Sequence, residues 1–313
     1  MKRLAVMAHY DPRGLVAPHV RRQVRALAES VDRLVVVTTA QLEDGARSFL
    51  AGHGELVERA NYGYDFFSYR TGLRSQDLAA YDEVTVCNDS YVGPLRPYAE
   101  VFSTMEREPV DFWGLTETDR VSHHVQSFFV TFRAWVVGSR AFETFWSEMA
   151  PLSRRGQVIR QYEVGMSTNL YDAGFASGAF FRETPADREL ARRRVRWWAL
   201  RRTGLPTSAA TARLLRTRAQ EPWNPSAGLA DAALDDGRLP YVKIDTLRYD
   251  PYGLGSRRLL ALCEERHPAA FDGVRDWLVE TDRFYPPRPT EQLLPVPVPL
   301  RPLRRVVEYR RAR

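Results

Sequence analysis

The sequence predicts an α/β fold in which helices flank a mostly parallel central sheet. Short apolar runs alternate with segments of helical spacing over about the first 90 residues, which is the pattern of successive strand–helix–strand units. Several of these runs end in polar side chains, as buried parallel strands do where they reach a ligand-binding edge. A chain of 313 residues is long enough to bury the core that such a sheet needs.

The first half of the chain supplies most of the predicted strands. The run at 4–11 stays apolar until its end, and the run at 33–40 is rich in β-branched residues. Between them, Val20, Val24, Leu27 and Ala28 recur with helical spacing. The predicted elements are a strand at 4–11, a helix at 16–29, a strand at 33–40, a short strand at 55–60, a helix at 65–79 and a strand at 81–89.

The second half of the chain is less regular. Gly174 is expected to end its longest helix as a C′ glycine. The predicted elements are a strand at 110–116, a strand leading into a helix at 126–137, helices at 141–149 and 158–175, a late strand at 238–248, and helices at 259–268 and 269–280. We expect a single domain at 1–280 with a basic helical insertion at 182–220, followed by an irregular tail rich in Pro and Arg at 281–313.

The composition is that of a globular protein, with 44% hydrophobic and 27% charged residues. No run of about 18 apolar residues is present, so no membrane-spanning helix is predicted. The apolar start is interrupted by Asp11 and Pro12 and reads as a strand, not a signal peptide. Cys87 and Cys263 are too far apart to suggest a disulfide framework or a zinc site. These features predict a cytoplasmic protein.

The formal net charge of +6 and the pI of about 9.4 come largely from arginines crowded at 187–218 and 283–313. A basic patch can bind nucleic acid, anionic lipid or a phosphorylated ligand. An arginine-rich composition explains the same excess, and both interpretations stay open. HExxH, P-loop, GxSxG and GxGxxG motifs are absent, which argues against common metalloproteases, NTPases, hydrolases and dinucleotide oxidoreductases.

Polar residues follow three predicted strands and are expected to converge on one crevice. They are His9–Tyr10–Asp11, Thr38–Thr39 and Asn88–Asp89–Ser90. A carboxylate at a buried strand end needs a cation or hydrogen-bond donors, so Asp89 is a candidate ligand for a hard divalent metal. Asn88 and Ser90 would support it. The alternative is a turn or a helix cap, which Asp and Ser also favour.

A second candidate segment combines Asn61, Gly63, Asp65 and Tyr69. Gly63 would let the backbone approach a ligand closely. Asp65 would either face that ligand or cap the helix that follows it. The alternative for the whole segment is a helix start with aromatic packing.

Two further candidate sites are Glu163 and the pair His123–His124. Glu163 shares a helical face with Met166 and Leu170, and its carboxylate could deprotonate an attacking hydroxyl or simply be solvated. His123 and His124 could bind a phosphate, an acceptor sugar or a metal. Because adjacent residues of a strand point to opposite faces, we expect at most one of the two histidines to face the site.

Taken together, these residues resemble the rhamnan-synthesis F family of glycosyltransferases for rhamnose-containing polysaccharides. The stretches run in family order, cover most of residues 4–250 and are specific as an ordered set. They are AHYDPRG (8–14), NYGYDFFSYRTGL (61–73), YDEVTVCNDSYVGPL (81–95), DFWGLT (111–116), HHVQSFFVTFR (123–133), FETFW (142–146), YEVGMSTNLYDAGF (162–175) and LPYVKIDTLR (239–248).

The resemblance implies a GT-A-like, Rossmann-like fold. Asn61–Gly63 stand where such enzymes place an asparagine-and-glycine segment, and Asn88–Asp89–Ser90 stand where they place a DxD-like metal motif. Glu163 precedes Gly174–Phe175 at the interval of the catalytic acid. Three features depart from the family pattern. The metal motif has one carboxylate, and Thr38–Thr39 replace an acid that often contacts the nucleotide base. The segments 182–220 and 281–313 lie largely outside the match.

The implied activity is inverting transfer of a deoxyhexose, with L-rhamnose from dTDP-rhamnose as the expected donor, to a saccharide acceptor in cell-surface polysaccharide synthesis. Glu163 would be the base, and Asp89 would hold Mg²⁺ or Mn²⁺. The implied donor-binding residues are Tyr10, Asp11, Asn61, Gly63, Asp65, Tyr69, Asn88 and Ser90, and the implied acceptor-binding residues are His123, His124 and Gln126.

A lipid-linked acceptor would place the chain at the inner face of the plasma membrane. The basic helix at 189–202, with Trp197, Trp198 and Leu200, suits an interfacial helix or else packs on the catalytic domain. A non-catalytic binding module on the same fold is the main alternative to an enzyme. Nucleic-acid binding is not expected, because it leaves the acidic motifs unexplained.

Overall fold

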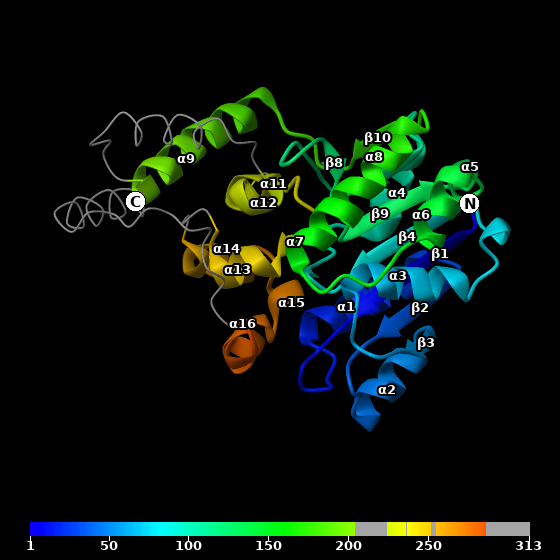
Figure 1. The fold of residues 1–313 in the computed structure, drawn as a ribbon. Helices are drawn as coiled ribbons and strands as arrows, with labels where there is room; N and C mark the ends of the chain where they lie inside the picture. The colour runs from blue at the N-terminus through cyan, green and yellow to red at the C-terminus, as the bar shows by residue number, and fades with distance from the viewer. Residues whose placement is uncertain (204–223, 236, 252–254, 286–313) are drawn as a thin grey trace.

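A seven-stranded sheet forms the centre of the fold in the computed structural model, which describes residues 1–203, 224–235, 237–251 and 255–285 (Figure 1). The strands are β1 (Arg3–His9), β2 (Arg33–Thr38), β3 (Glu55–Glu58), β4 (Glu83–Asn88), β6 (Phe112–Gly114), β9 (Phe129–Arg133) and β10 (Ser177–Ala179), in the order β10-β6-β9-β4-β1-β2-β3. Strand β9 pairs antiparallel to β4 and β6, while the other neighbouring strands pair in parallel. The predicted α/β fold with a mostly parallel sheet is therefore confirmed.

The sheet register brings three strand ends to one edge. His9 of β1 is opposite Thr38 of β2, and Ala8 of β1 is opposite Asn88 of β4. The polar residues that follow these strands consequently lie at the same carboxyl edge, where open α/β sheets place their ligands.

Alternate residues of the central strands pack into two cores, one on each face. Ala5, Met7 and Cys87 face the first core with α1 (Pro18–Ser30), α2 (Asp44–Ala51) and α4 (Tyr98–Glu106). The opposite face carries Val6 and Val86. It is covered by α3 (Tyr64–Arg74), α5 (Ala134–Val137), α6 (Arg140–Ser147) and α8 (Gly165–Asp172). The period of two explains why these strands are apolar almost throughout, since both faces are buried.

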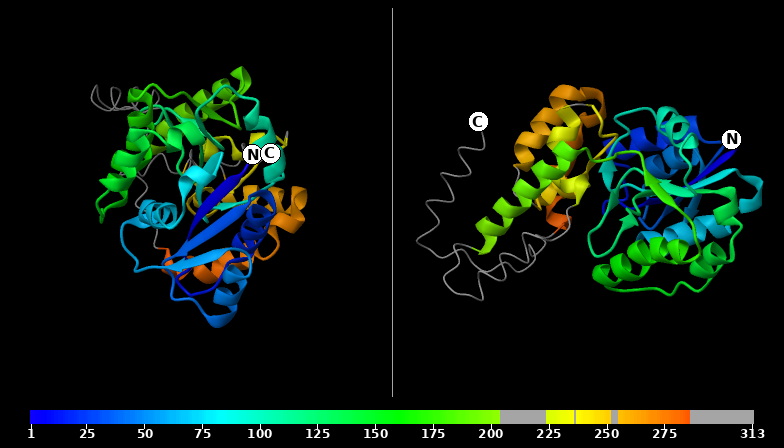
Figure 2. Two further views of the ribbon diagram at one scale, coloured as in Figure 1. Left: turned by 90° about the vertical axis from the view of Figure 1, so that its right-hand side faces the viewer. Right: turned by 90° about the horizontal axis from the view of Figure 1, so that it is seen from above.

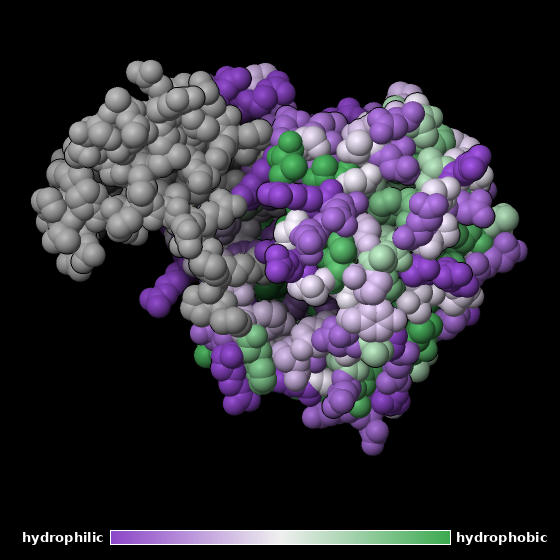
Figure 3. Space-filling model, viewed as in Figure 1, coloured by the Kyte–Doolittle hydropathy of each residue, from purple (hydrophilic) through white to green (hydrophobic). Residues whose placement is uncertain are grey.

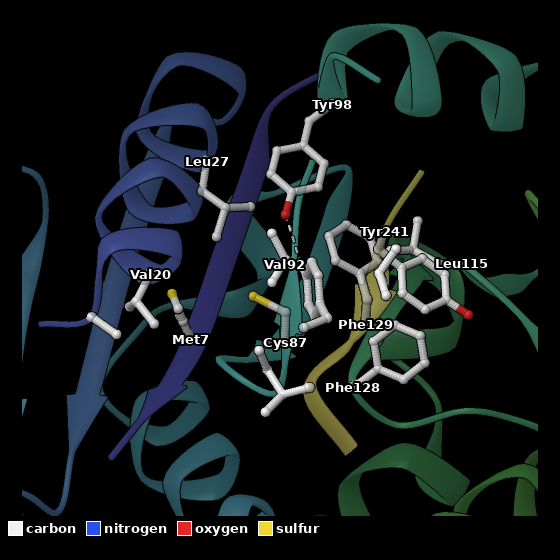
Figure 4. Close-up of a cluster of buried hydrophobic side chains, with 14 of the residues drawn as sticks. Met7, Val20, Leu27, Cys87, Val92, Tyr98, Leu115, Phe128, Phe129 and Tyr241 are labelled. Carbon is white, nitrogen blue, oxygen red and sulfur yellow. Dashed lines mark hydrogen bonds between the residues drawn. The ribbon is translucent and has the colours of Figure 1, made fainter. Parts of the chain in front are cut away.

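The C-terminal third is helical and extends the first core. Its elements are α9 (Pro185–Thr203), α11 (Pro225–Gly228), α12 (Ala230–Asp235), β11 (Val242–Lys243), α13 (Ile244–Tyr249), α14 (Ser256–Arg266), α15 (Pro268–Phe271), α16 (Val274–Thr281) and a 3₁₀ turn at Asp282–Phe284. These helices lie beside the sheet, and α9 runs along their far side (Figure 2). Tyr241 packs beside Phe128, with Cys87 and Met7 in the same cluster (Figure 4). The sheet and the C-terminal helices thus contribute side chains to the same core.

Three predicted elements differ from the structure. The late strand at 238–248 is wrong: only Val242–Lys243 pair with the equally short β5 (Tyr91–Val92), and α13 follows at once. The helix at 269–280 is divided by Gly273, which has φ +73°. The helix at 158–175 exists but includes a π-helical turn at Ile159–Val164, between α7 (Arg155–Val158) and α8.

The basic segment is described only in part. The helix α9 accounts for the first half of the predicted insertion at 182–220, and 204–223 lie outside the described residues, as do 286–313 of the predicted tail. Within the described ranges, no helix combines the length and apolarity needed to cross a bilayer. The described part of the face in Figure 3 is mostly polar, with apolar residues in small separate patches.

Candidate active site

Asn88, the last residue of β4, connects three elements at the carboxyl edge of the sheet. Its side-chain amide donates to Asp65 Oδ2 at 2.7 Å, and its Oδ1 accepts from Ser90 Oγ at 2.6 Å and from the Ser90 backbone N–H at 3.1 Å. Its backbone carbonyl accepts from Gln23 Nε2 at 2.9 Å. Every polar group of the buried Asn88 side chain is thus engaged, which fixes the positions of both neighbours.

Lys243 joins this edge from β11. Its Nζ donates to Ser90 Oγ at 2.5 Å and lies 4.1 Å from the centre of the Phe128 ring. Partial burial lowers the pKa of Lys243 to about 8, against the opposing attraction of Asp245 and Glu163. We call Tyr10, Asp65, Asn88, Asp89, Ser90 and Lys243 the strand-end cluster.

The two carboxylates of the strand-end cluster lack a full complement of stabilising partners. Asp89 Oδ2 accepts the Tyr10 backbone N–H at 2.7 Å, yet partial burial raises the pKa of Asp89 to about 7, and the charges of Asp65 and Asp11 add to the rise. Asp65 is exposed at the rim of the cluster, but crowding by surrounding protein still raises the pKa of its carboxyl group. A positive charge placed between them would therefore be stabilised.

The same carboxylates fit a hard divalent cation. No group of three or more acidic, His or Cys side chains gathers around a metal position in the described parts of the chain. Mg²⁺, however, is commonly held by one or two carboxylates together with substrate phosphates and water. Asp65 and Asp89 offer the oxygen donors and the uncompensated negative charge for a cation that arrives with a phosphate ligand.

Tyr10 and Asp11 have different environments at the end of β1. The Tyr10 side chain is 43% exposed and able to contact a ligand. Asp11 is buried, and its carboxylate accepts from the Arg13 backbone N–H at 2.8 Å and from Trp277 Nε1 at 3.5 Å. Asp11 therefore shapes the loop after β1 and ties it to α16.

The loop before α3 is organised by Arg59. Its guanidinium donates to the carbonyls of Ala60, Tyr62 and Tyr64 at 2.7–2.9 Å and to Ser68 Oγ. Asn61, within this loop, is exposed beside the helix start. Arg59 therefore holds the backbone of residues 60–64 in place ahead of α3.

Gly63 allows this loop to turn into α3. Its φ is +72°, and a Cβ added there would lie 2.5 Å from two ring atoms of Phe67. Gly63→Ala is expected to lower the free energy of unfolding by about 2 kcal/mol, because left-handed strain and a steric clash act together. Urea denaturation measures this loss. Gly174→Ala is the control, since Gly174 has φ +89° but nothing within 4 Å of an added Cβ; equal losses in both variants would contradict a role for Phe67.

Glu163 lies in the π-helical turn, a rare conformation that often occurs at functional sites. Ser127 donates to Glu163 Oε2 through both its backbone N–H, at 3.2 Å, and its Oγ. Oε1 lies 3.5 Å from His124 Nε2, and the carboxylate keeps 21% of its side-chain surface exposed. One oxygen is thus held in place while the other faces the histidine.

His124 and Glu163 form an ion pair. The Ser122 carbonyl, 2.8 Å from His124 Nδ1, can only accept, so Nδ1 carries a proton and Nε2 faces the carboxylate. Burial disfavours the charged form of each group. The attraction between the imidazolium and the carboxylate, together with hydrogen bonds from Ser127 to the carboxylate and from the imidazolium to the Ser122 carbonyl, outweighs this cost. The pKa of Glu163 is lowered and that of His124 is raised. His123, in contrast, is exposed and pairs with Asp119 at 2.8 Å.

The side chains of Tyr69 and Gln126 are buried and bond to other parts of the protein. Tyr69 is fully buried and donates to the Ser127 carbonyl at 3.0 Å, so it supports the residue that holds Glu163 and leaves no surface for direct contact with a ligand. Gln126 is buried, and its Oε1 accepts from Ser226 Oγ, which also bonds to Tyr241. In the structure, Tyr69 and Gln126 therefore have buried protein partners in place of the expected ligand contacts.

Two cavities of about 340 and 460 Å³ lie elsewhere on the molecule. The first is lined by α4, β10 and Arg238, and the second by the start of β2 and the end of α2. Neither includes a member of the strand-end cluster or Glu163. The candidate site is consequently defined by its hydrogen-bonded side chains and their charges at the sheet edge.

Comparison with known proteins gives a family match and distant relatives. A family profile described as "Rhamnan synthesis protein F" matches residues 34–195, more than half of the chain. An uncharacterized protein, y4gN, of Sinorhizobium fredii is 25% identical over 185 residues, covering 57% of this chain and 48% of that protein. The virulence protein VirA of Vibrio anguillarum is 28% identical over 116 residues, covering 35% and 36%. The chain thus spans about half or less of the length of these relatives.

Among solved structures, the chain is similar to glucosyl-3-phosphoglycerate synthase from Mycobacterium tuberculosis in complex with Mn²⁺, uridine diphosphate and phosphoglyceric acid. The sequence identity is 13% and the TM-score is 0.39, with 71% of this chain and 79% of that chain covered.

Proposed function

Because the chain belongs to the rhamnan synthesis protein F family, we propose that it is a glycosyltransferase that moves a deoxyhexose from a nucleotide diphosphate sugar to a saccharide hydroxyl. The observation that carries the proposal is the pairing of two sites at one sheet edge. Glu163 is a fixed, partly exposed carboxylate suited to accept a proton, and the strand-end cluster suits a diphosphate with or without a cation.

The proposed reaction is a single displacement at the anomeric carbon. The acceptor oxygen forms a bond to this carbon as the bond to the diphosphate oxygen breaks, so the configuration inverts. The electron pair of the broken bond stays with the diphosphate, and the acceptor proton moves to Glu163. Tyr10 and Asn61, which are exposed at the strand ends, would contact the nucleotide. His124 would orient Glu163.

Asp89 and Asp65 are the residues that would hold a Mg²⁺ or Mn²⁺ ion. Such an ion, when bound, stabilises negative charge on a leaving diphosphate. The residues of this chain keep their own roles: Asn88 orients Asp65, and the Tyr10 N–H orients Asp89.

The family points to dTDP-L-rhamnose as donor and to a saccharide or lipid-linked saccharide as acceptor, with transfer on the cytoplasmic side of the membrane. Contact of 189–202 with the membrane surface belongs to this proposal. The described backbone of that segment is the helix α9, which runs along the far side of the C-terminal helices.

A donor screen with purified protein tests the function. Release of nucleoside diphosphate is measured for dTDP-rhamnose, other dTDP-sugars, UDP-sugars and GDP-sugars, each with a rhamnose-containing oligosaccharide acceptor and with or without EDTA. Acceptor-dependent release from a deoxyhexose donor is expected. Donor binding without turnover for any acceptor would instead favour a non-catalytic binding module, and absence of all nucleotide binding would overturn both.

His124→Gln is expected to move the acid limb of the pH profile of kcat/KM to higher pH. The imidazolium helps to lower the pKa of Glu163, so wild-type Glu163 stays ionised to lower pH. Without that charge, burial dominates and the Glu163 pKa rises. Rates measured across the acid range test this shift. His123→Gln is the control, because His123 is exposed and bonds to Asp119; an unmoved limb in His124→Gln would contradict the ion pair.

A further inference from the structure

Lysine is rare in this chain, and one of its lysines lies at the candidate site. Of the 45 lysines and arginines, only Lys2 and Lys243 are lysines. Lys2 is exposed at the start of β1, at the far end of the sheet, whereas Lys243 is partly buried in the strand-end cluster. A lysine differs from an arginine in having a compact ammonium group, which suits a single close contact with a phosphate oxygen.

The hydrogen bonds around Lys243 all point in one direction. Lys243 donates to Ser90 Oγ, and Ser90 Oγ donates to Asn88 Oδ1. The Asn88 side-chain amide then donates to Asp65 Oδ2. A cation and a carboxylate therefore terminate one polarised chain that crosses the end of β4, and each bond strengthens the next.

The ammonium of Lys243 has donor capacity beyond this chain. An ammonium carries three N–H donors. Ser90 is its one hydrogen-bond acceptor within the described residues, and the ring of Phe128 covers another side at 4.1 Å. Most of the charged groups around it are acidic: Asp245, Glu163 and Asp65 attract the ammonium, while Arg155 repels it.

We propose that Lys243 is the residue that binds the leaving diphosphate, a role that rests on the glycosyltransferase function proposed above. As the bond between the anomeric carbon and the diphosphate oxygen breaks, its electron pair moves to that oxygen and adds one negative charge to the diphosphate. The free N–H donors of Lys243 meet this growing charge, while the acceptor proton leaves to Glu163. Lys243 and a cation on Asp89 would share this stabilisation, so the single carboxylate of the Asn88–Asp89–Ser90 motif is complemented by a fixed positive charge.

Binding of dTDP and of thymidine, measured by titration calorimetry, separates the diphosphate contribution from that of the nucleoside. Lys243→Met is expected to weaken dTDP binding by about tenfold or more, the usual effect of losing one charge-assisted hydrogen bond, and to leave thymidine binding within about twofold. Lys243→Arg should keep part of the dTDP affinity. The matched control is Lys2→Met, which removes a lysine that lies 5.1 Å from the Tyr81 ring but far from the site.

Wild-type protein labelled with ¹³C-lysine provides a second measurement that does not depend on a variant. With two lysines, the side-chain spectrum holds two sets of signals. The Lys243 signal should move with dTDP and not with thymidine, and the Lys2 signal should stay. An unmoved Lys243 signal at saturating dTDP, or equal dTDP affinity in wild type and Lys243→Met, would overturn the role of Lys243. Failure of the wild type to bind any nucleoside diphosphate would instead overturn the proposed function itself.

Discussion

Replacing Glu163 by glutamine is expected to lower the rate of sugar transfer by about 10²- to 10⁴-fold, the usual contribution of a general base. Glutamine keeps the size of the side chain, and its carbonyl oxygen can still accept from Ser127. It cannot take a proton from the acceptor. The donor should therefore bind as before, because the strand-end cluster is unchanged, and the loss should appear in kcat.

Single-turnover transfer rates and donor titration together test this expectation. Glu143→Gln is the matched control, since Glu143 is an exposed helical glutamate on α6. Ser127→Ala adds a graded case, because it removes the hydroxyl from Glu163 Oε2 and keeps the carboxylate. Full transfer activity in Glu163→Gln would remove Glu163 from the role of base.

The strand-end residues could be brought together from the sequence because parallel strands share an edge. Tyr10, Asp89 and Asn88 follow recognisable apolar runs, and the register aligns those runs. Lys243 could not be placed in the same way, because 153 residues separate it from Ser90 and its strand pairs over only two residues. The signal available was the rarity of lysine in an arginine-rich chain.

The local backbone geometry and the direction of side chains are further properties of the site that the sequence does not predict. The spacing of apolar residues predicts the helix that carries Glu163, but it gives no sign of the π-helical turn, in which Glu163 bonds to Ser127, two residues after β8 (His124–Val125). Tyr69 and Gln126 have polar tips that find buried partners in distant segments, Ser127 and Ser226. Sequence alone cannot distinguish such a partner from a ligand.

The opposite edge of the sheet contains a buried ion-pair network that has no part in the proposed chemistry. Glu83 starts β4 and is fully buried, and Arg133 ends β9 with 4% of its side chain exposed. Arg133 Nη1 donates to Glu83 Oε1, and its Nη2 donates to the Met105 carbonyl at 2.7 Å. Arg3 Nε donates to the other carboxylate oxygen of Glu83 at 2.7 Å.

Arg133→Met is expected to lower the free energy of unfolding by about 3 kcal/mol, because Glu83 keeps a buried charge with one partner fewer and the Met105 carbonyl keeps only the Glu108 N–H as a donor. Urea denaturation measures the loss. In the double variant Glu83→Leu/Arg133→Met most of the stability should return, since no buried charge is left unpaired. Arg275→Met removes an exposed pair with Glu264 and should cost less than about 1 kcal/mol. If Arg133→Met loses no more than this control, Arg3 alone is sufficient to stabilise the Glu83 carboxylate.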